Sequence, residues 1–260
     1  MLHELRLFFI ALQVLTRVPV PRWVGFEPGW LNDSARHFPA VGLCVGAVGA
    51  VVLWAAAHWW TAWIAVLLSM AATLWLTGAF HEDGLADTAD VLGGNVPRER
   101  ALQIMNDSHV GTYGVVALLL VLALKGAALH AMSLRDLVAA LAALPLAHAW
   151  SRSASVVLLA MLPYAGDADH AKSKPLAQQA GSSALLMAAV WALLAAAVAS
   201  VAWPLPAIGA AAGVAALTTL LVGRWLSQRL GGFTGDTLGA AQQVCEVAVY
   251  LALSTALVHA

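Results

Sequence analysis

Seven long apolar runs, separated by short polar segments, set the pattern of this 260-residue chain. A helix needs about 20 mostly apolar residues to cross a bilayer. The runs predict spans near residues 38–59, 62–80, 111–132, 137–162, 184–203, 206–224 and 239–259. Residues 5–16 are also apolar but continue into Arg17 and Pro19 without a small-residue cleavage site, which predicts a retained N-terminal membrane-associated helix. We therefore expect an all-α, polytopic membrane bundle of about seven transmembrane helices plus this N-terminal helix, formed as one domain over residues 1–260.

The composition agrees with an integral membrane protein. Hydrophobic residues make up 61% of the chain and charged residues only 10%, which lies outside the range of soluble globular domains. The formal net charge of −1 gives no reason to expect a nucleic-acid partner. Cys44 and Cys245 lie in apolar runs without a CxxC spacing, which predicts core residues rather than a disulfide or a zinc site.

The basic residues are distributed unevenly between the two ends of the predicted spans. If residues 81–110 face the cytoplasm, all but two of the 13 Lys and Arg residues lie in or beside cytoplasmic segments. Only Lys125 and Arg135 fall toward the opposite side. Because cytoplasmic loops of membrane proteins are enriched in Lys and Arg, this distribution predicts that residues 81–110 face the cytoplasm.

An acidic motif at residues 82–90 interrupts this apolar sequence. Asp83, Asp87 and Asp90 are spaced i, i+4 and i+7, so a helix would project them from one face. Three like charges on one face repel each other and call for a cation, and oxygen ligands favour Mg²⁺ or Mn²⁺. We include the neighbouring Glu82 among the candidate metal ligands. The plainer interpretation is a solvated, acidic helix start.

Two glycine-rich segments add candidates for binding phosphate. Arg98 and Arg100 could clamp phosphate oxygens or anchor the loop, and Asp107 and Ser108 precede a predicted span whose N-terminus would suit an anion. Asp107 could instead be an N-cap. The second segment, residues 231–239, holds further candidates.

Within that second segment, Asp236 is either a helix cap or a functional carboxylate, and Thr234 precedes it as a candidate substrate contact. Arg36 at the start of the first span and Arg152 within the fourth are further candidates for substrate binding. For Arg152 the alternative is snorkelling. Glu246, at membrane depth, is either functional or paired inside the bundle.

The order and spacing of these motifs resemble those of the cobalamin synthase family, the adenosylcobinamide-GDP ribazoletransferases. The resemblance rests on motifs that run through nearly the whole chain: FFIALQVLTRVP at 8–19, RHFP at 36–39 with Val41 and Gly42, HEDGLADTAD at 81–90, IMNDS at 104–108, GTYG at 111–114, SRS at 151–153, LPY at 162–164 and GFTGDTLGA at 232–240. Val91 and Ser151 stand where the family pattern favours glycine, and neither change removes a carboxylate or an arginine.

The resemblance implies a reaction. A hydroxyl of α-ribazole, or of α-ribazole 5′-phosphate, attacks the β-phosphorus of adenosylcobinamide-GDP, and GMP leaves. It also implies Mg²⁺ as cofactor and the bacterial cytoplasmic (inner) membrane as location, within the lipid bilayer. Asp83 and Asp87 would then hold one or two Mg²⁺ on the diphosphate, with Asp236 in the same site, and Asp90 would be a further ligand or the base. A homo-oligomer stays open.

Two other functions remain at this point. A membrane phosphotransferase acting on a nucleotide-activated lipid alcohol also uses an aspartate-rich motif, but the spacing of its first aspartates and its Ala-Arg pair are absent here. A cation- or proton-coupled transporter would use Asp83, Asp87 and Glu246 as a relay, and its acidic residues should lie near the middle of the membrane on broken helices.

Overall fold

The computed structural model describes residues 2–94, 97, 109–166 and 177–257, which fold almost entirely into helices. The α-helices are α1 (Leu2–Leu15), α2 (Pro28–Ser34), α3 (Phe38–Ala57), α4 (Ala62–Thr77), α5 (Phe80–Leu92), α7 (Thr112–Arg135), α8 (Leu137–Met161), α9 (Ser182–Ala199), α10 (Leu205–Leu230) and α11 (Gly235–Ala256). Short 3-10 turns, η1 (Arg22–Val24) and η2 (Ala35–His37), flank α2. The all-α class predicted from the sequence is confirmed.

Each of the seven predicted spans corresponds to a helix, but the count of seven membrane crossings is not confirmed. Among the described residues, four helical stretches are long and apolar enough to cross a membrane: Gly29–Ala57, α7, α9 and α10. The number rises to five if α4 and α5 together form one broken span. The helices α8 and α11 fall outside this set, and both bury several polar and charged side chains. An apolar run therefore does not by itself show how many helices cross.

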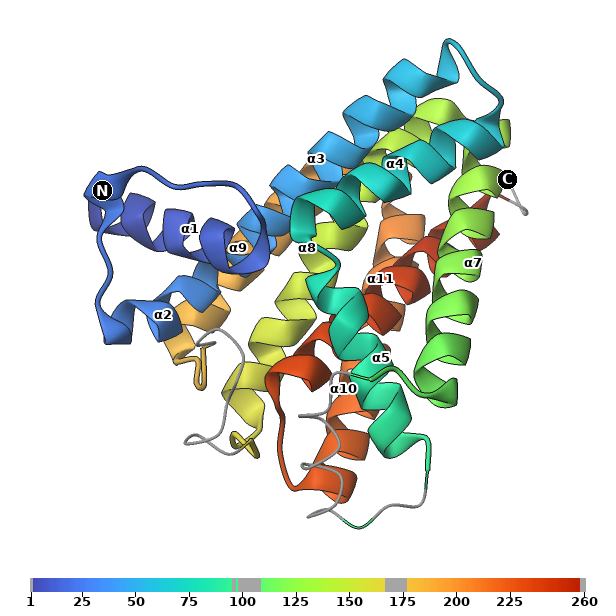
Figure 1. The fold of residues 1–260 in the computed structure, drawn as a ribbon. Coiled ribbons are helices and arrows are strands. Elements are labelled where there is room, and N and C mark those ends of the chain that lie inside the picture. Colours follow the sequence, from blue (N-terminus) through green and yellow to red (C-terminus); the bar gives the residue numbers. More distant parts are fainter. Residues whose placement is uncertain (1, 95–96, 98–108, 167–176, 258–260) are drawn as a thin grey trace.

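The helix α8 lies at the centre of the bundle. It packs against α3, α9 and α11, and α11 packs in turn against α5 and α10 (Figure 1). Buried leucines such as Leu129 and Leu144 form the main apolar core together with Tyr250. Trp203 is buried beside this core and donates a hydrogen bond from Nε1 to the carbonyl oxygen of Ala139 at 3.0 Å.

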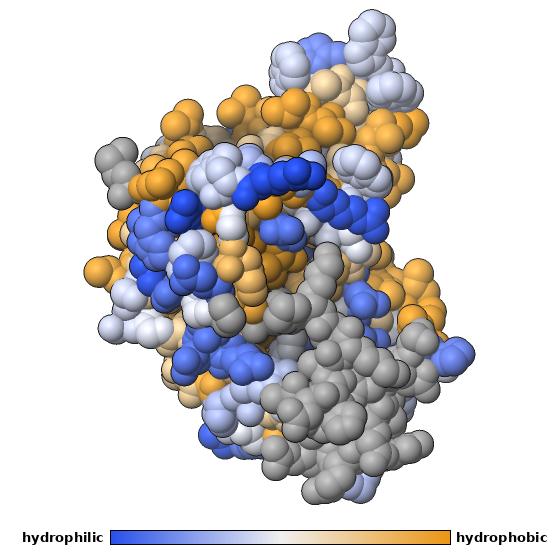
Figure 2. Space-filling view, turned by 60° about the vertical axis from the view of Figure 1, so that its left-hand side comes forward, coloured by the Kyte–Doolittle hydropathy of each residue, from blue (hydrophilic) through white to orange (hydrophobic). Residues whose placement is uncertain are grey.

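Large apolar side chains remain exposed on the outer helices. Trp75 of α4 is 72% exposed, and Leu193 of α9 and Leu205 of α10 are exposed to a similar extent. A soluble monomer rarely leaves so many large apolar groups in water, whereas lipid accommodates them. Hydrophilic residues gather across the middle of the face shown in Figure 2, with apolar residues above them. The exposed apolar residues on the outer helices support a membrane protein.

The chain bends sharply between α4 and α5. Gly78 and Ala79 both adopt left-handed backbone conformations, with φ of 69° and 57°, and the two helix axes differ by 87°. The apolar run therefore ends with α4, and the predicted span at 62–80 is cut three residues early. Beyond the break, α5 lies between α7 and α11 (Figure 1). This bend places the acidic motif against two helices distant in sequence.

One element of the charge distribution requires correction. The sequence pattern places Lys125 toward the side opposite the acidic motif. In the structure, Lys125 belongs to α7 and is buried in the bundle, where its amine forms an ion pair with Glu246 of α11. Lys125 therefore does not count as a loop charge, and only Arg135 remains as a basic residue on that side.

Candidate active site

The helices α5 and α11 touch at a glycine, and this contact brings two parts of the acidic set together. A Cβ atom placed on Gly84 of α5 would lie 2.6 Å from the carbonyl oxygen of Asp236 and 3.0 Å from its Cα. Only a residue without a side chain permits such a close approach. As a result, Asp83 and Asp87 on α5 lie within electrostatic range of the Asp236 carboxyl group in the first turn of α11.

The structure settles which residue caps α11. Thr234 is the N-cap, and its hydroxyl accepts a hydrogen bond from the backbone N–H of Thr237 at 3.3 Å. The Thr237 hydroxyl accepts in return from the backbone N–H of Thr234 at 2.8 Å, which completes a capping box. Asp236 is therefore not the cap. Of the two alternatives left open by the sequence, the structure excludes the N-cap, and the functional role of Asp236 remains a prediction.

Both facing aspartates have raised pKa values. Burial, and then the neighbouring carboxylates Asp236, Asp83 and Asp90, raise the pKa of Asp87 to about 7. Burial and the Asp83 carboxylate raise the pKa of Asp236 to about 6. The pKa of a carboxyl group rises when its charged form is buried and has like charges beside it with no cation to offset them. Among the described residues, no positive side chain lowers the pKa of Asp87 or of Asp236.

These carboxylates fit Mg²⁺ if a substrate supplies the rest of its ligands. In the part of the chain that the structure describes, no group of three or more His, Cys, Asp or Glu side chains is placed to hold a metal ion. Mg²⁺, however, usually takes one or two carboxylates and completes its octahedron with water and phosphate oxygens. Asp83 and Asp87 with Asp236 opposite suit that mode of binding, because burial and the neighbouring negative charges raise the pKa values of Asp87 and Asp236.

Asp90 shares the acidic motif but is engaged elsewhere. Its Oδ2 accepts a hydrogen bond from the backbone N–H of Gly111 at 2.6 Å, and its Oδ1 accepts from that of Gly114 at 2.8 Å. These two N–H groups belong to the first turn of α7. Both oxygens therefore bind backbone, and the roles of Asp90 as ligand or base remain predictions.

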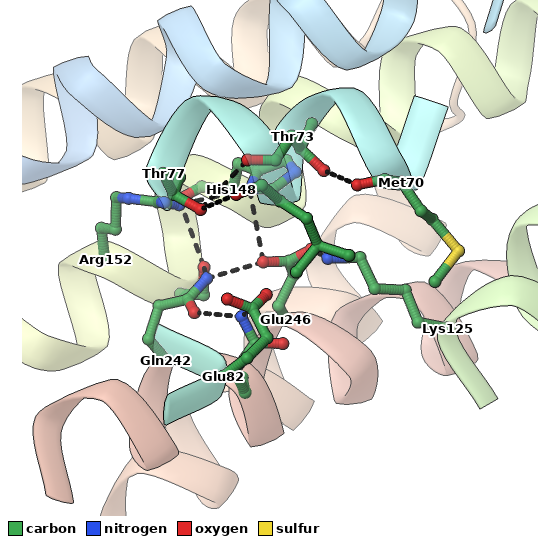
Figure 3. A network of polar contacts seen from close by, with 12 residues as sticks. Met70, Thr73, Thr77, Glu82, Lys125, His148, Arg152, Gln242 and Glu246 are labelled. Atoms are coloured by element: carbon green, nitrogen blue, oxygen red, sulfur yellow. Dashed lines mark hydrogen bonds and ion pairs between the residues drawn. The ribbon is translucent and has the colours of Figure 1, made fainter. Parts of the chain in front are cut away.

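Glu82 lies in a buried polar network (Figure 3). The network contains four charged and several neutral polar side chains from four helices: Glu82 of α5; Lys125 of α7; His148, Ser151 and Arg152 of α8; and Gln242, Gln243 and Glu246 of α11. The Oε1 atom of Glu82 accepts a hydrogen bond from Nε2 of Gln243 at 2.9 Å. The predicted metal role of Glu82 remains a prediction, since its observed partner is an amide.

Arg152 and Glu246 belong to the same network. Arg152 is 2% exposed, and its Nη1 lies 3.2 Å from Nδ1 of His148 and donates to the His148 carbonyl oxygen at 3.1 Å. Arg152 therefore does not snorkel. Glu246 is fully buried and pairs with Lys125 and, at 3.3 Å, with His148. Of its two alternatives, the structure shows Glu246 paired inside the bundle.

Of the remaining candidates, Arg36 forms ion pairs near the N-terminus of the chain and four others lie outside the described residues. Arg36 binds the Glu4 carboxylate of α1 at 3.2 Å and that of Asp33 at 3.1 Å. Four further candidates fall in the segment that the structure does not describe: Arg98, Arg100, Asp107 and Ser108. Their predicted roles in binding substrate stay predictions.

Sequence reasoning missed the two glutamines that connect Glu82 to the network. Gln242 and Gln243 are fully buried in α11, within a run predicted to be apolar. Two adjacent amides at membrane depth are a signal in themselves, because burying polar groups there is costly unless each finds a partner. Their partners, however, are distant in sequence and could not be identified from it.

Comparison with known proteins places this geometry in a family. The family model of cobalamin-5-phosphate synthase matches residues 7–254. The chain belongs to this family. It is 59% identical to the adenosylcobinamide-GDP ribazoletransferase of Leptothrix cholodnii over 96% of both chains. Relatives of the same name from Polaromonas naphthalenivorans and Shewanella oneidensis are 41% and 42% identical over 99% and 96% of this chain. No solved structure matches the chain.

The matched region of the cobalamin-5-phosphate synthase family covers both halves of the carboxylate cluster. It contains α5 with Asp83 and Asp87 and also α11 with Asp236. The α5–α11 contact at Gly84 therefore lies wholly inside the family region. The family resemblance inferred from the sequence motifs is confirmed.

Proposed function

We propose that this chain is a Mg²⁺-dependent adenosylcobinamide-GDP ribazoletransferase. Its family and the names of its relatives support the transferase activity. The observation that carries the proposal is the approach of Asp83 and Asp87 to Asp236 across the α5–α11 contact. Phosphoryl transfer needs charge neutralisation and positioning around a diphosphate, and this cluster offers oxygen ligands from two helices.

In the proposed reaction, a hydroxyl oxygen of α-ribazole forms a bond to the β-phosphorus of adenosylcobinamide-GDP. The bond from that phosphorus to the GMP oxygen breaks, and the hydroxyl proton is lost. The family description favours α-ribazole 5′-phosphate as an acceptor as well. Bound Mg²⁺ would neutralise the diphosphate charge and stabilise the leaving oxygen.

The chain's own residues supply the ligands and the geometry. Asp83 and Asp87 would hold the metal from α5, and Asp236 from α11. The glycine contact fixes the distance between the two helices, because neither backbone can move closer. The close packing would thus bring ligands from separate elements around one diphosphate, which a single helix face could not do.

We also propose that the enzyme lies in the bacterial cytoplasmic membrane with the aspartates facing the cytoplasm. The distribution of Lys and Arg residues supports this orientation. Nucleotide conjugates and Mg²⁺ are available on that side.

The test is conversion of adenosylcobinamide-GDP plus α-ribazole, or its 5′-phosphate, by the purified full chain in lipid nanodiscs. We expect GMP release that stops with a chelator and returns with Mg²⁺. A nucleotide-activated lipid alcohol in place of the cobinamide substrate should give no GMP or CMP. Turnover that persists without divalent cation would refute the metal dependence, and turnover only with the lipid alcohol would refute the transferase assignment.

A further inference from the structure

Two carboxylates of the acidic motif, Glu82 and Asp90, accept hydrogen bonds from neighbouring helices, whereas Asp83 and Asp87 lie near the Asp236 carboxyl group. We propose that Glu82 and Asp90 are positioning residues that anchor α5 at two points and keep Asp83 and Asp87 opposite Asp236. This inference rests on the proposed function for its link to catalysis, but the anchoring itself can be measured separately. The proposal divides the acidic motif into metal ligands, Asp83 and Asp87, and anchors, Glu82 and Asp90, although all four are carboxylates.

The Asp90 anchor acts as a helix cap supplied from another helix. The N-cap of α7 is Gly111, which has no side chain with which to cap. The two Asp90 oxygens accept the N–H groups of Gly111 and of Gly114, the third residue of the helix. In a capping box the N-cap and third-residue N–H groups are satisfied by side chains of the same helix. Here one carboxylate of α5 satisfies both and so joins the end of α5 to the start of α7.

The Glu82 anchor joins the start of α5 to the bundle interior. Glu82 is 7% exposed, and its partner Gln243 is 2% exposed. Gln243 also donates to Oε1 of Gln242 at 2.8 Å, and Gln242 donates to Ser151 at 2.9 Å and to Glu246 at 2.6 Å. This chain of hydrogen bonds ties α5 to α11 and α8 (Figure 3). Because every member is buried, water cannot replace a lost partner easily.

Helix geometry explains why two anchors are needed. Glu82 and Asp90 are eight residues apart, or about 12 Å along the axis. Asp83 and Asp87, spaced i and i+4, lie between them on one face. A helix held at one point can still rotate or tilt. Two points bound to different helices fix the rotation of α5 and hence the direction of the Asp83 and Asp87 carboxylates.

Isosteric amides separate anchors from ligands. Glu82→Gln keeps an oxygen that accepts from Gln243, and Asp90→Asn keeps one oxygen that can accept from one of the two N–H groups of Gly111 and Gly114. Neither amide binds a divalent cation as a carboxylate does. The matched control variants are Asp83→Asn and Asp87→Asn. Each full-length variant is studied in nanodiscs by Mn²⁺ electron paramagnetic resonance, by the Mg²⁺ dependence of GMP release, and by hydrogen exchange of the amides at 111–114.

We expect Glu82→Gln and Asp90→Asn to bind Mn²⁺ within roughly threefold of the wild type, since Glu82→Gln keeps its anchoring bond and Asp90→Asn keeps one of its two. The control variants Asp83→Asn and Asp87→Asn should bind Mn²⁺ at least about tenfold more weakly. The variants Glu82→Leu and Asp90→Ala, which remove the anchoring side chains, should do the same, because loss of an orienting partner costs about 10–100-fold in metal affinity. Asp90→Ala should speed exchange of both the Gly111 and the Gly114 amides, Asp90→Asn should speed exchange of one of them at most, and the other variants should change neither.

Three results would overturn the proposal. If Glu82→Gln or Asp90→Asn weakens Mn²⁺ binding as much as Asp83→Asn, that residue is a ligand. If Glu82→Leu and Asp90→Ala leave Mn²⁺ binding and the Mg²⁺ dependence unchanged, the residues do not position the site. If Asp90→Ala leaves amide exchange at 111–114 unchanged, the cap is absent. Should the wild type bind no Mn²⁺, the metal in the proposed function fails, while the exchange data still decide the Asp90 anchor.

Discussion

Adding one methyl group at the α5–α11 contact should impair catalysis. In Gly84→Ala the new Cβ would lie 2.6 Å from the Asp236 carbonyl oxygen, well inside van der Waals contact. The atoms it meets are backbone, so no side chain can rotate away. The two helices must separate, and the carboxylates of α5 move relative to Asp236.

The size of the effect follows from that displacement. Overpacking a tight contact costs about 1–3 kcal/mol of folding free energy. Displacement of catalytic groups by about 1 Å can cost roughly a hundredfold in rate. We therefore expect Gly84→Ala to fold with a lowered melting temperature, to release GMP about a hundredfold more slowly, and to need more Mg²⁺ for half-maximal rate.

The matched control is Gly213→Ala. Gly213 lies inside α10, and nothing lies within 4 Å of the position its Cβ would occupy. Alanine should there raise stability by about 0.5–1 kcal/mol through helix propensity, without changing turnover. Purified variants in nanodiscs are compared by thermal melting and by the initial rate of GMP release over a Mg²⁺ titration. A Gly84→Ala variant with wild-type rate and Mg²⁺ requirement would refute the role of the contact.

Three further predictions concern the carboxylates and the topology. Asp83→Ala and Asp87→Ala should each leave less than about a tenth of wild-type GMP release in a protein that still inserts and melts cooperatively, because a lost metal ligand costs several kcal/mol in the transition state; greater retention argues against the ligand assignment. Asp236→Asn should raise the Mg²⁺ requirement or lower kcat, and wild-type kinetics would show that its charge is dispensable. In spheroplasts that express the protein without Cys44, its exposed native cysteine, Thr61→Cys should react with an impermeant thiol reagent and Ser227→Cys should not. The reverse pattern would overturn the orientation.

The long helices could be predicted because each is encoded by a local apolar run, but their ends and crossings depend on contacts. The break at Gly78–Ala79 is an example. The glycine gave a weak signal for a helix end, while Ala79 is an ordinary helix former that adopts φ of 57° here. The left-handed conformation at Ala79 follows from the packing of α5 between α7 and α11 rather than from its own preference. Local propensity therefore favoured one continuous span where the chain bends by 87°.

In the candidate site too, local spacing could be read from the sequence, whereas the partners of each carboxylate depend on tertiary contacts. The i, i+4 spacing was enough to place Asp83 and Asp87 on one face, and glycines beside Asp236 indicated a close approach. Spacing alone also assigned Asp90 to that set. The structure shows that a third carboxylate in register with two others can turn to the bare N-terminus of α7, because unpaired N–H groups there attract it.

Glu246 shows what a single sequence can and cannot give for a buried charge. Its position at membrane depth was sufficient to require a partner, since an isolated carboxylate there is unstable. The partner is Lys125, far away in the sequence and itself mistaken for a residue near a loop. Each charge is costly alone, and together with Arg152 and Glu82 they form a set of two acids and two bases in one buried network. Because removing either member of such a pair leaves the other uncompensated, the network constrains the helices that carry it, and α5 with its two open aspartates is one of them.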